Sequence, residues 1–336
     1  EYKVVFRDSI ETYCPLIKKG DRLPFKSRWN SYDFGEYNKY GRPDLLTVSY
    51  SKDVTFEGVK TTNSLLMLAP ISNNCGRIIF RNCEMSLAPG AIITSSADGI
   101  HLGSNRFGVI IDNCEFGNSF DDLINTQTYS GEITKIINDY TYETSRDMFC
   151  SVGDEIKFFN TSNHEIVGTA FLKEIEKKED GGYRLTVDRK VYKVLSQETS
   201  NTPTSMYNLD SANKGNIIKK STFKNSRRHA YIIRSACSIV ENNIMENNSG
   251  AALEAANEIH GTSNEGLVPS ALTFRNNTVS GEGISSKYVP LKIYSWNAQL
   301  GEQACIDGVL IENNTIDVPS MYGSININSV TGLYML

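Results

Sequence analysis

The sequence lacks the features that mark a zinc protein, a membrane protein or a nucleic-acid-binding protein. It has four His without H-x-x-x-H spacing, and its seven Cys include no C-x-x-C pair, so a zinc signature is absent. No run of about 18 apolar residues occurs, so we expect no membrane-spanning helix. The formal net charge is −5, and Lys and Arg are scattered along the chain. We therefore expect neither a nucleic-acid partner nor a polybasic membrane contact.

A chain of 336 residues buries a large core without disulfide or metal staples. Cys83, Cys114 and Cys237 fall within or at the start of apolar runs, so we expect them to pack as small buried hydrophobes. The chain opens on Glu1 with no Met and no signal peptide, as a trimmed or mature chain would.

An internal repeat is the most informative feature that is present. Seven segments align without gaps, each an apolar strand, a polar residue and a second short strand. They start at Val54, Ile78, Val109, Asn216, Ser238, Leu272 and Val309. The shortest spacing, from Ile217 to Ile239, is 22 residues, which is the length of one β-helix coil. We therefore predict an all-β fold, a right-handed parallel β-helix, in preference to an irregular β-sandwich.

The polar residue of the repeat is Asn in five of the seven copies: Asn82, Asn113, Asn242, Asn276 and Asn313. Asn tolerates the left-handed backbone conformation, so we predict that the strand turns a corner there. Stacked coils would then align these side chains into a hydrogen-bonded ladder.

One interval is far longer than a coil, at 107 residues from Ile110 to Ile217. Within it, residues 153–159, 165–175 and 181–191 read as alternating strands joined by turns. We predict a small antiparallel β-barrel at 130–208, inserted between β-helix segments 51–129 and 209–336. Residues 1–50 are expected to form an N-terminal capping or barrel-like segment, since residues 16–25 resemble the opening of the inserted barrel.

Three carboxylates carry the strongest functional signal. Asp98 precedes Asp121 and Asp122 by 23 and 24 residues, which is one coil. Coils stack about 4.8 Å apart, so the three side chains should lie together on one face. We expect their repulsion to raise at least one pKa and to leave another group ionised, which is the division that glycoside hydrolysis requires. The alternatives at this point are a plain turn at Asp98-Gly99 and a calcium site.

The stretch from Thr94 to Asn125, with A-D-G-x-H, G-x-I-x-x-x-x-C-x-F and D-D-x-x-N, resembles glycoside hydrolase family 110. That family comprises bacterial exo-acting α-1,3-galactosidases built on a β-helix with an inserted barrel. The resemblance implies that Asp98, Asp121 and Asp122 are active-site aspartates, and that hydrolysis is inverting and uses no metal or other cofactor. It also implies a secreted, periplasmic or cell-surface enzyme whose partner is a carbohydrate with a terminal α-galactoside.

Two departures from the family pattern bear on specificity and on the proton donor. D-D-x-x-N is followed here by residues 126–128, Thr-Gln-Thr, where the family often has Val-His-Gly. The segment at 257–267 has no Trp or Tyr. Glu265 stands where the family's later acidic residue is expected and is the candidate proton donor, with Glu254 and Glu258 as alternatives.

Four further residues are candidates for binding the sugar. His101 lies three residues after Asp98, and Arg228 and Arg234 are favoured over Arg227 to reach the aspartates from the next coil. Trp296 is one of two tryptophans and could stack on a sugar face.

The preferred interpretation is an inverting exo-glycosidase that releases terminal α-1,3-linked galactose. Because one coil step of about 4.8 Å is shorter than the roughly 6.5–9.5 Å between acid and base in inverting enzymes, the three aspartates should share one side of the sugar. The alternatives are another β-helix carbohydrate enzyme, such as a polysaccharide lyase or depolymerase, and a non-catalytic glycan-binding spike. The oligomeric state stays open, and a homo-oligomer is compatible with it because β-helix ends need caps or partners.

Overall fold

The computed structural model describes residues 44–64, 66–146, 148–162, 165–179, 181–257, 265–267, 269–281, 289–295, 306–318 and 323–336. The chain divides into two compact units, residues 1–41 and residues 42–336, and all described residues belong to the second. Within these ranges the one helical element is a 3-10 turn, Leu209–Ser211. No helix in the described part has the length and apolarity to cross a membrane.

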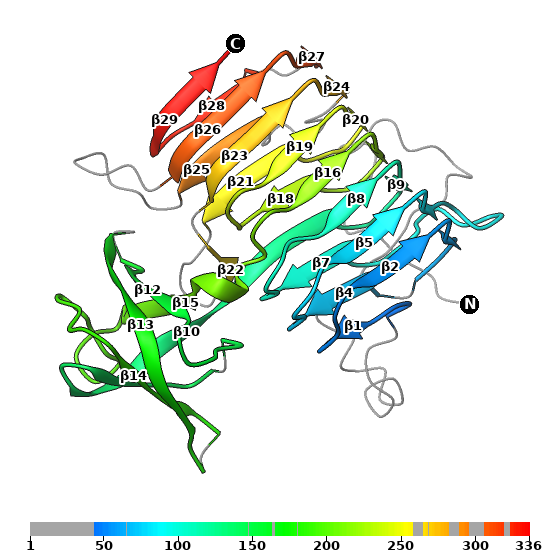
Figure 1. The fold of residues 1–336 in the computed structure, drawn as a ribbon. Helices are drawn as coiled ribbons and strands as arrows, with labels where there is room; N and C mark the ends of the chain where they lie inside the picture. The colour runs from blue at the N-terminus through cyan, green and yellow to red at the C-terminus, as the bar shows by residue number, and fades with distance from the viewer. Residues whose placement is uncertain are drawn as a thin grey trace, which may run out of the picture. The chain divides into compact units, whose positions relative to one another are not determined.

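Three parallel sheets form the body of the described unit (Figure 1). The first contains β1 Val48–Ser49, β4 Ala69–Ser72, β7 Ile100–Gly103, β10 Ile124–Asn138, β18 Tyr231–Ile233, β21 Leu253–Asn257, β25 Leu291–Ser295 and β28 Ile325–Ile327. The second contains β2 Val54–Glu57, β5 Ile78–Arg81, β8 Ile110–Asp112, β16 Ile217–Lys219, β19 Ile239–Glu241, β23 Ser270–Arg275, β26 Ile306–Glu312 and β29 Val330–Met335. The third contains β3 Lys60–Thr61, β6 Glu84–Met85, β9 Glu115–Gly117, β17 Thr222–Lys224, β20 Ile244–Glu246, β24 Thr278–Ser280 and β27 Thr315–Asp317. The predicted parallel β-helix is confirmed.

The second sheet contains the repeat found in the sequence, and all seven copies lie in the predicted register. Ile110 pairs with Ile217 across the 107-residue interval, and Ile217 pairs with Ile239 one coil later. The inward-facing row of this sheet is apolar and buried, and it comprises Phe80, Ile111, Ile218, Val240, Phe274 and Ile311. Period-2 alternation therefore gives each coil an apolar inner side, and stacking these sides forms the core.

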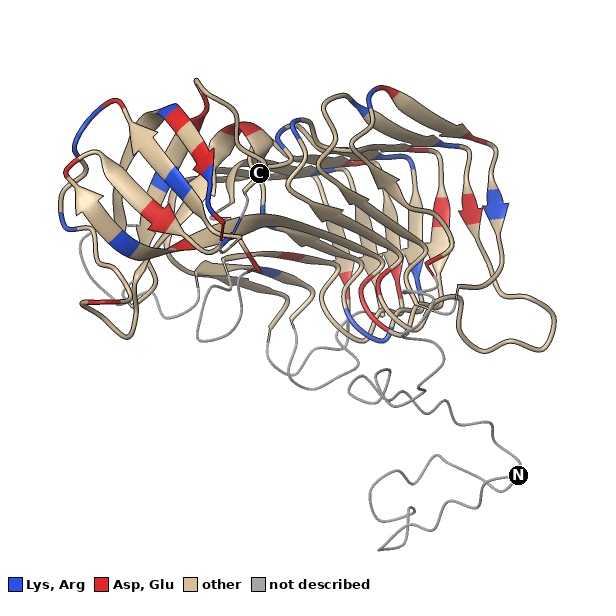
Figure 2. Cartoon of the chain, turned by 90° about the horizontal axis from the view of Figure 1, so that it is seen from below, with Lys and Arg blue, Asp and Glu red and all other residues tan. Residues whose placement is uncertain are grey.

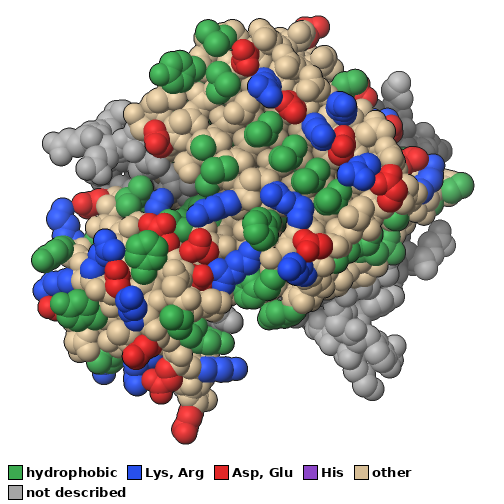
Figure 3. Space-filling view, in the orientation of Figure 1, with side chains coloured by type: hydrophobic (Ala, Val, Ile, Leu, Met, Phe, Trp, Pro, Cys, Tyr) green, Lys and Arg blue, Asp and Glu red, His purple; other side chains and the backbone are tan. Residues whose placement is uncertain are grey.

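The outward row of the second sheet alternates in charge from coil to coil: Glu57, Arg81, Asp112, Lys219, Glu241, Arg275 and Glu312. Arg275 contacts Glu241 at 2.8 Å, and Lys219 contacts Asp112 at 3.4 Å. Opposite charges that face each other on neighbouring strands stabilise this pairing of the coils. Charged residues are spread over the coils and the barrel (Figure 2), and on the face seen in Figure 3 both signs are interspersed with hydrophobic side chains.

The corner after the second sheet has the predicted backbone conformation. Asn82, Asn113, Asn242, Asn276 and Asn313 have φ between 51° and 56°, in the left-handed region. The predicted ladder, however, is mainly one residue further along. Asn243 Nδ2 donates to Asn277 Oδ1, and Asn277 Nδ2 donates to Asn314 Oδ1, each at 3.0 Å. The left-handed residue turns its side chain outward, so the next side chain points into the core and forms the ladder.

The cysteine prediction holds in part. Cys83 and Cys114 are buried at this corner. In these early coils they occupy the position that the ladder asparagines occupy in later coils. Cys237 is exposed, because it occupies a left-handed turn with φ of 57° before its strand begins.

The antiparallel insertion is a closed six-stranded barrel. Strand β10 leaves the first parallel sheet and continues into the barrel (Figure 1), where it pairs with both β11 Thr141–Thr144 and β15 Thr204–Asn208. Strands β12 Glu155–Asn160, β13 Ile166–Lys177 and β14 Tyr183–Val187 complete the closure in the order β11-β14-β13-β12-β15. The predicted barrel is confirmed. The division of the chain into four segments stays a prediction, since residues 1–43 lie outside the described ranges.

The asparagine ladder should contribute measurably to stability. Asn277 accepts from Asn243 and donates to Val240 O and Asn314 Oδ1. Replacing it by Ala leaves these buried groups unsatisfied, so Asn277→Ala should lower the free energy of unfolding by about 2–4 kcal/mol. The exposed Asn326 of β28 is the control, and Asn326→Ala should change it by less than about 0.5 kcal/mol. Urea unfolding with unchanged m-values measures both, and equal midpoints would contradict a stabilising ladder.

Candidate active site

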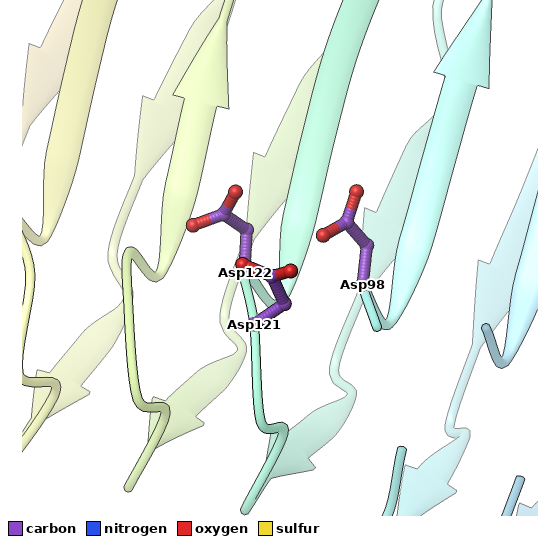
Figure 4. A group of neighbouring side chains, drawn as sticks. All are labelled: Asp98, Asp121 and Asp122. Carbon is purple, nitrogen blue, oxygen red and sulfur yellow. The ribbon is translucent and has the colours of Figure 1, made fainter. Parts of the chain in front are cut away.

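Asp98, Asp121 and Asp122 come together, as their spacing predicts. Asp98 lies at the bend before β7, and Asp121 and Asp122 lie at the bend before β10 on the neighbouring coil (Figure 4). One carboxylate oxygen from each residue lies within 4.8 Å of the others, and all three side chains are buried. Three buried carboxylates at this separation would repel one another strongly unless cations were close.

Backbone contact between the two coils sets this geometry. Gly99 N donates to Asp122 O at 2.9 Å, and Ile100 N donates to Leu123 O at 2.8 Å. A Cβ on Gly99 would lie 2.5 Å from Leu123 O, so only glycine allows the coils to approach this closely. The Asp98-Gly99 pair is therefore the part of the coil that brings the Asp98 side chain to the cluster.

Asp122 is held by the residues that precede β18. His229 donates to Asp122 Oδ1 twice, from its backbone N at 3.0 Å and from Nδ1 at 2.8 Å. Arg228 Nε lies 3.8 Å from the same oxygen, and Arg228 Nη1 lies 3.6 Å from Asp121 Oδ1. Burial acts to raise the pKa of Asp122, but the charge and hydrogen bonds of His229 and the charge of Arg228 hold it well below its ordinary value.

His229 is fully buried between two carboxylates. Its Nε2 lies 3.2 Å from Glu254 Oε2 on β21. Burial acts to lower its pKa, but the charge and hydrogen bond of Asp122 and the contact with Glu254 raise the pKa of His229 to about 9. Glu254 also accepts from Tyr294 at 3.1 Å and lies 3.7 Å from Lys292. Although burial opposes ionisation, these groups lower the pKa of Glu254.

Asp98 has its own partners on the outward row of the first sheet. His101 Nδ1 lies 2.6 Å from Asp98 Oδ2, and Asn125 Nδ2 donates to the same oxygen at 3.3 Å. Gln127 Nε2 contacts the other ring nitrogen of His101 at 2.6 Å. Burial opposes protonation of His101, but the hydrogen bond and charge of Asp98 raise its pKa.

Arg234 connects this row to Glu265. The guanidinium is buried, and its Nη1 lies 2.9 Å from both Asn125 Oδ1 and Glu265 Oε2. Glu265 lies on β22, Glu265–Gly266, which pairs antiparallel with β10 at Thr128 and Tyr129. Its side chain is 42% exposed, so it stands at the rim of the site.

The structure thus brings most of the predicted site residues into one network. His101, Arg228 and Arg234 each contact the aspartates directly or through Asn125. Glu265 joins the network through Arg234 and does not contact an aspartate among the described atoms. Trp296 and Glu258 lie outside the described residues. Arg227 packs over the Phe120 ring at 5.1 Å and is exposed, in keeping with its lower rank.

The electrostatic expectation was that one carboxyl pKa is raised and another group stays ionised, and it did not say which. Asp122 is a group that stays ionised, since its pKa is lowered. The reason is that His229 and Arg228 place positive charge beside it from the next coil, which outweighs both burial and the neighbouring carboxylates.

Sequence reasoning missed His229, Gln127, Lys292 and Tyr294. A signal for His229 was present: it follows Asp122 by 107 residues, the same interval that separates Ile110 from Ile217. Extending the repeat register to the first sheet would therefore have placed His229 beside Asp122. Glu254 lies on the following coil, three residues beyond the position that the register places opposite His229, and it pairs with Ile232.

Three carboxylates are also the ligand type that a hard divalent cation prefers. Here Asp122 Oδ1 is taken by His229 and Asp98 Oδ2 by His101 and Asn125, and Arg228 lies beside the pair. With these cationic and hydrogen-bonding partners in place, the donor set fits a cation poorly.

The curated proteins that this chain matches carry one name, Alpha-1,3-galactosidase B. The protein from Akkermansia muciniphila is 24% identical over 69% of this chain and 30% of its own length. The one from Phocaeicola vulgatus is 23% identical over 88% of this chain and 53% of its own, and that from Parabacteroides distasonis is 22% identical over 68% and 39%. The chain thus spans about half or less of the length of these relatives. These likenesses support a galactosidase-like family.

No family model matches the chain. Among solved structures, the A-module of a mannuronan C-5 epimerase from Azotobacter vinelandii is 8% identical, with a TM-score of 0.36 over 85% of this chain and 65% of that chain.

The raised pKa of His229 predicts how stability depends on pH. Because it rises from 6.5 to about 9 on folding, its contribution should be fully present below pH 6.5 and should be lost as pH rises through about 9. The loss for wild type should be on the order of 2–3 kcal/mol larger than for His229→Asn, whose side chain does not titrate. Urea unfolding at pH 6, 7.5 and 9.5 measures the difference, and His101 contributes equally to both proteins. Parallel pH profiles would contradict a charged His229.

Proposed function

We propose that this chain carries the active site of a glycoside hydrolase that removes terminal α-1,3-linked galactose from glycans. The observation that carries the proposal is the cluster of Asp98, Asp121 and Asp122, three buried carboxylates from adjacent coils with cationic partners behind them. The names of the relatives support the galactoside as substrate. The enzyme is proposed to act outside the cytoplasm, where such glycans are displayed.

The proposed outcome is inversion with the three aspartates on one side of the sugar, as the family resemblance implies. An inverting enzyme separates acid and base carboxyls by roughly 6.5–9.5 Å, so that a water fits beside the sugar. One oxygen of each aspartate lies within 4.8 Å of the others. The three are too close together to contain the acid–base pair of an inverting enzyme, so the proposal places them on the side from which water attacks and takes the proton donor from elsewhere.

Glu265 is the proposed proton donor. Its carboxylate pairs with Arg234, which also donates to Asn125, and its side chain is 42% exposed at the rim of the site, where a glycosidic oxygen can approach it. The oxygen of water forms a bond to the anomeric carbon and gives its proton to an aspartate. The bond from that carbon to the glycosidic oxygen breaks, and Glu265 protonates the leaving oxygen.

The rest of the outward row provides hydrogen bonds to sugar hydroxyls. His101 and Gln127 lie together at the end of Asp98's network, and Arg228 and Arg234 line the same region. An exo-acting enzyme needs hydrogen-bond donors and acceptors of this kind around one terminal sugar. Trp296 stays a proposed stacking residue.

A β-helix polysaccharide lyase is the second candidate, favoured by one observation: three clustered carboxylates are the ligand type that calcium prefers, although their partners here fit a cation poorly. A lyase would lose activity with EDTA and would form an unsaturated product that absorbs in the ultraviolet. The proposed hydrolase would do neither.

Neutralising the cluster should abolish hydrolysis. With α-1,3-galactobiose and an aryl α-galactoside as substrates, Asp121→Asn and Asp122→Asn should each lower kcat/KM by at least about 100-fold, since they remove a buried charge beside the reacting carbon. The control is Asp112→Asn on the second sheet, which should keep wild-type activity. Galactose release measures all three, and wild-type rates in both Asp121→Asn and Asp122→Asn would refute the assignment.

A further inference from the structure

His229 lies between two carboxylates and takes no part in the hydrolytic steps described above. It precedes β18, on the coil between the one that carries Asp122 and the one that carries Glu254. Its ring spans these neighbours, with Nδ1 at 2.8 Å from Asp122 Oδ1 and Nε2 at 3.2 Å from Glu254 Oε2. It has no exposed side-chain surface, so it does not touch a substrate in this arrangement.

A carboxylate beside each ring nitrogen favours the doubly protonated, charged form of the ring, in keeping with the raised pKa of His229. Glu254 is fixed in turn by Tyr294 at 3.1 Å and by Lys292 at 3.7 Å. The chain from Lys292 and Tyr294 through Glu254 and His229 thus ends on one oxygen of Asp122. Asp122 Oδ2 makes no hydrogen bond to a described residue and is left for the substrate side.

The three aspartates differ in how exposed their carboxylates are and in which groups hold them. Asp121 has no exposed side-chain surface, whereas Asp122 and Asp98 retain a little. Asp98 is held by His101 and Asn125, which themselves line the outward row. Asp122 alone is held by a fully buried ring and by the backbone of the same residue, which fixes its direction.

We propose that His229 is a positioning residue that makes Asp122 the general base, and that Glu254 is the counter-ion that holds His229 in place. This rests on the proposed function. In the step, water attacks the anomeric carbon as its proton passes to Asp122 Oδ2, and the glycosidic bond breaks with protonation of the leaving oxygen by the acid. Glu254 is then an ionised support, which leaves Glu265 as the proton donor.

Other charged and titratable groups lie around the series of contacts that runs from Lys292 through Glu254 and His229 to Asp122. Arg228 lies beside Asp121 and Asp122, Lys292 lies beside Glu254, and the Asp98–His101 pair lies on the adjoining coil. Arg228, with 30% of its side chain exposed, is the one cation other than His229 that contacts Asp122 among the described residues. Removing the charge of His229 therefore leaves Asp122 with a single, partly solvated cation.

The test is the pH profile of kcat and kcat/KM for α-1,3-galactobiose. Asn places its Nδ2 near the position of the His Nδ1, so His229→Asn keeps a hydrogen-bond donor toward Asp122 but removes the charge. It should lower kcat about 10- to 100-fold with little change in KM, as removal of a supporting partner typically does. Because a base must be ionised, its acidic limb should move up by roughly one to three pH units.

Glu254→Gln is the second variant, which retains His229 and its bond to Asp122. Losing the counter-ion lowers the proton affinity of the ring, so the pKa of His229, followed by NMR of its ring, should fall below the wild-type value while activity near pH 6 stays within about 10-fold of wild type. Glu241→Gln on β19 is the matched control. Glu241 forms an ion pair with Arg275 on the second sheet, away from the site, so the pH profile of Glu241→Gln should equal that of wild type.

The outcomes separate the two proposals. If wild type releases galactose but the acidic limb of His229→Asn is unmoved, the positioning role is refuted and the hydrolase stands. Should His229→Asn fail to fold, a ring titration of His229 in Glu254→Gln that matches wild type refutes it instead. If wild type cleaves no α-galactoside, the proposed function fails and the role of His229 falls with it.

Discussion

Backbone hydrogen bonds between successive coils fix the strands and bends from which the side chains of the candidate site project. Their register is the constraint on which the site depends. Asp98 and Asp122 are neighbours because Gly99 N donates to Asp122 O, and His229 reaches Asp122 because Leu123 N donates to His229 O. A shift of one residue in any of these strands would turn the outward row inward. The apolar inner rows, the charge alternation on the second sheet and the asparagine ladder all resist such a shift.

The site itself is an arrangement of buried charge. Four carboxylates, Asp98, Asp121, Asp122 and Glu254, lie behind the surface of the first sheet, and isolated burial of any one would be costly. His101, Arg228, His229 and Lys292 provide the opposing charge or hydrogen bonds from neighbouring coils. This pairing keeps Asp122 ionised in a place where burial alone would protonate it. An ionised carboxylate is the group that activates water in the hydrolysis of a glycosidic bond.

Much of this was predictable from the sequence, for a physical reason. A solenoid converts sequence spacing into spatial distance, so the repeat starting at Val54 predicted the register, and the 23- and 24-residue offsets predicted the aspartate cluster. The same rule, applied to the 107-residue interval, would have found His229. The ladder position and the pKa of Asp122 were not predictable in this way. They depend on which way a side chain leaves the corner and on which charges surround it, and a spacing contains neither.

The proposed mechanism places the aspartates and a separate acid on opposite sides of a terminal α-galactoside. Proton NMR of the sugar first released from α-1,3-galactobiose, recorded before mutarotation mixes the anomers, shows which face the water attacks. Attack by water from the aspartate side predicts β-galactose as the first product. If α-galactose appeared first, two of the clustered carboxylates would be working as a retaining pair, and the separation into base side and acid side would be wrong.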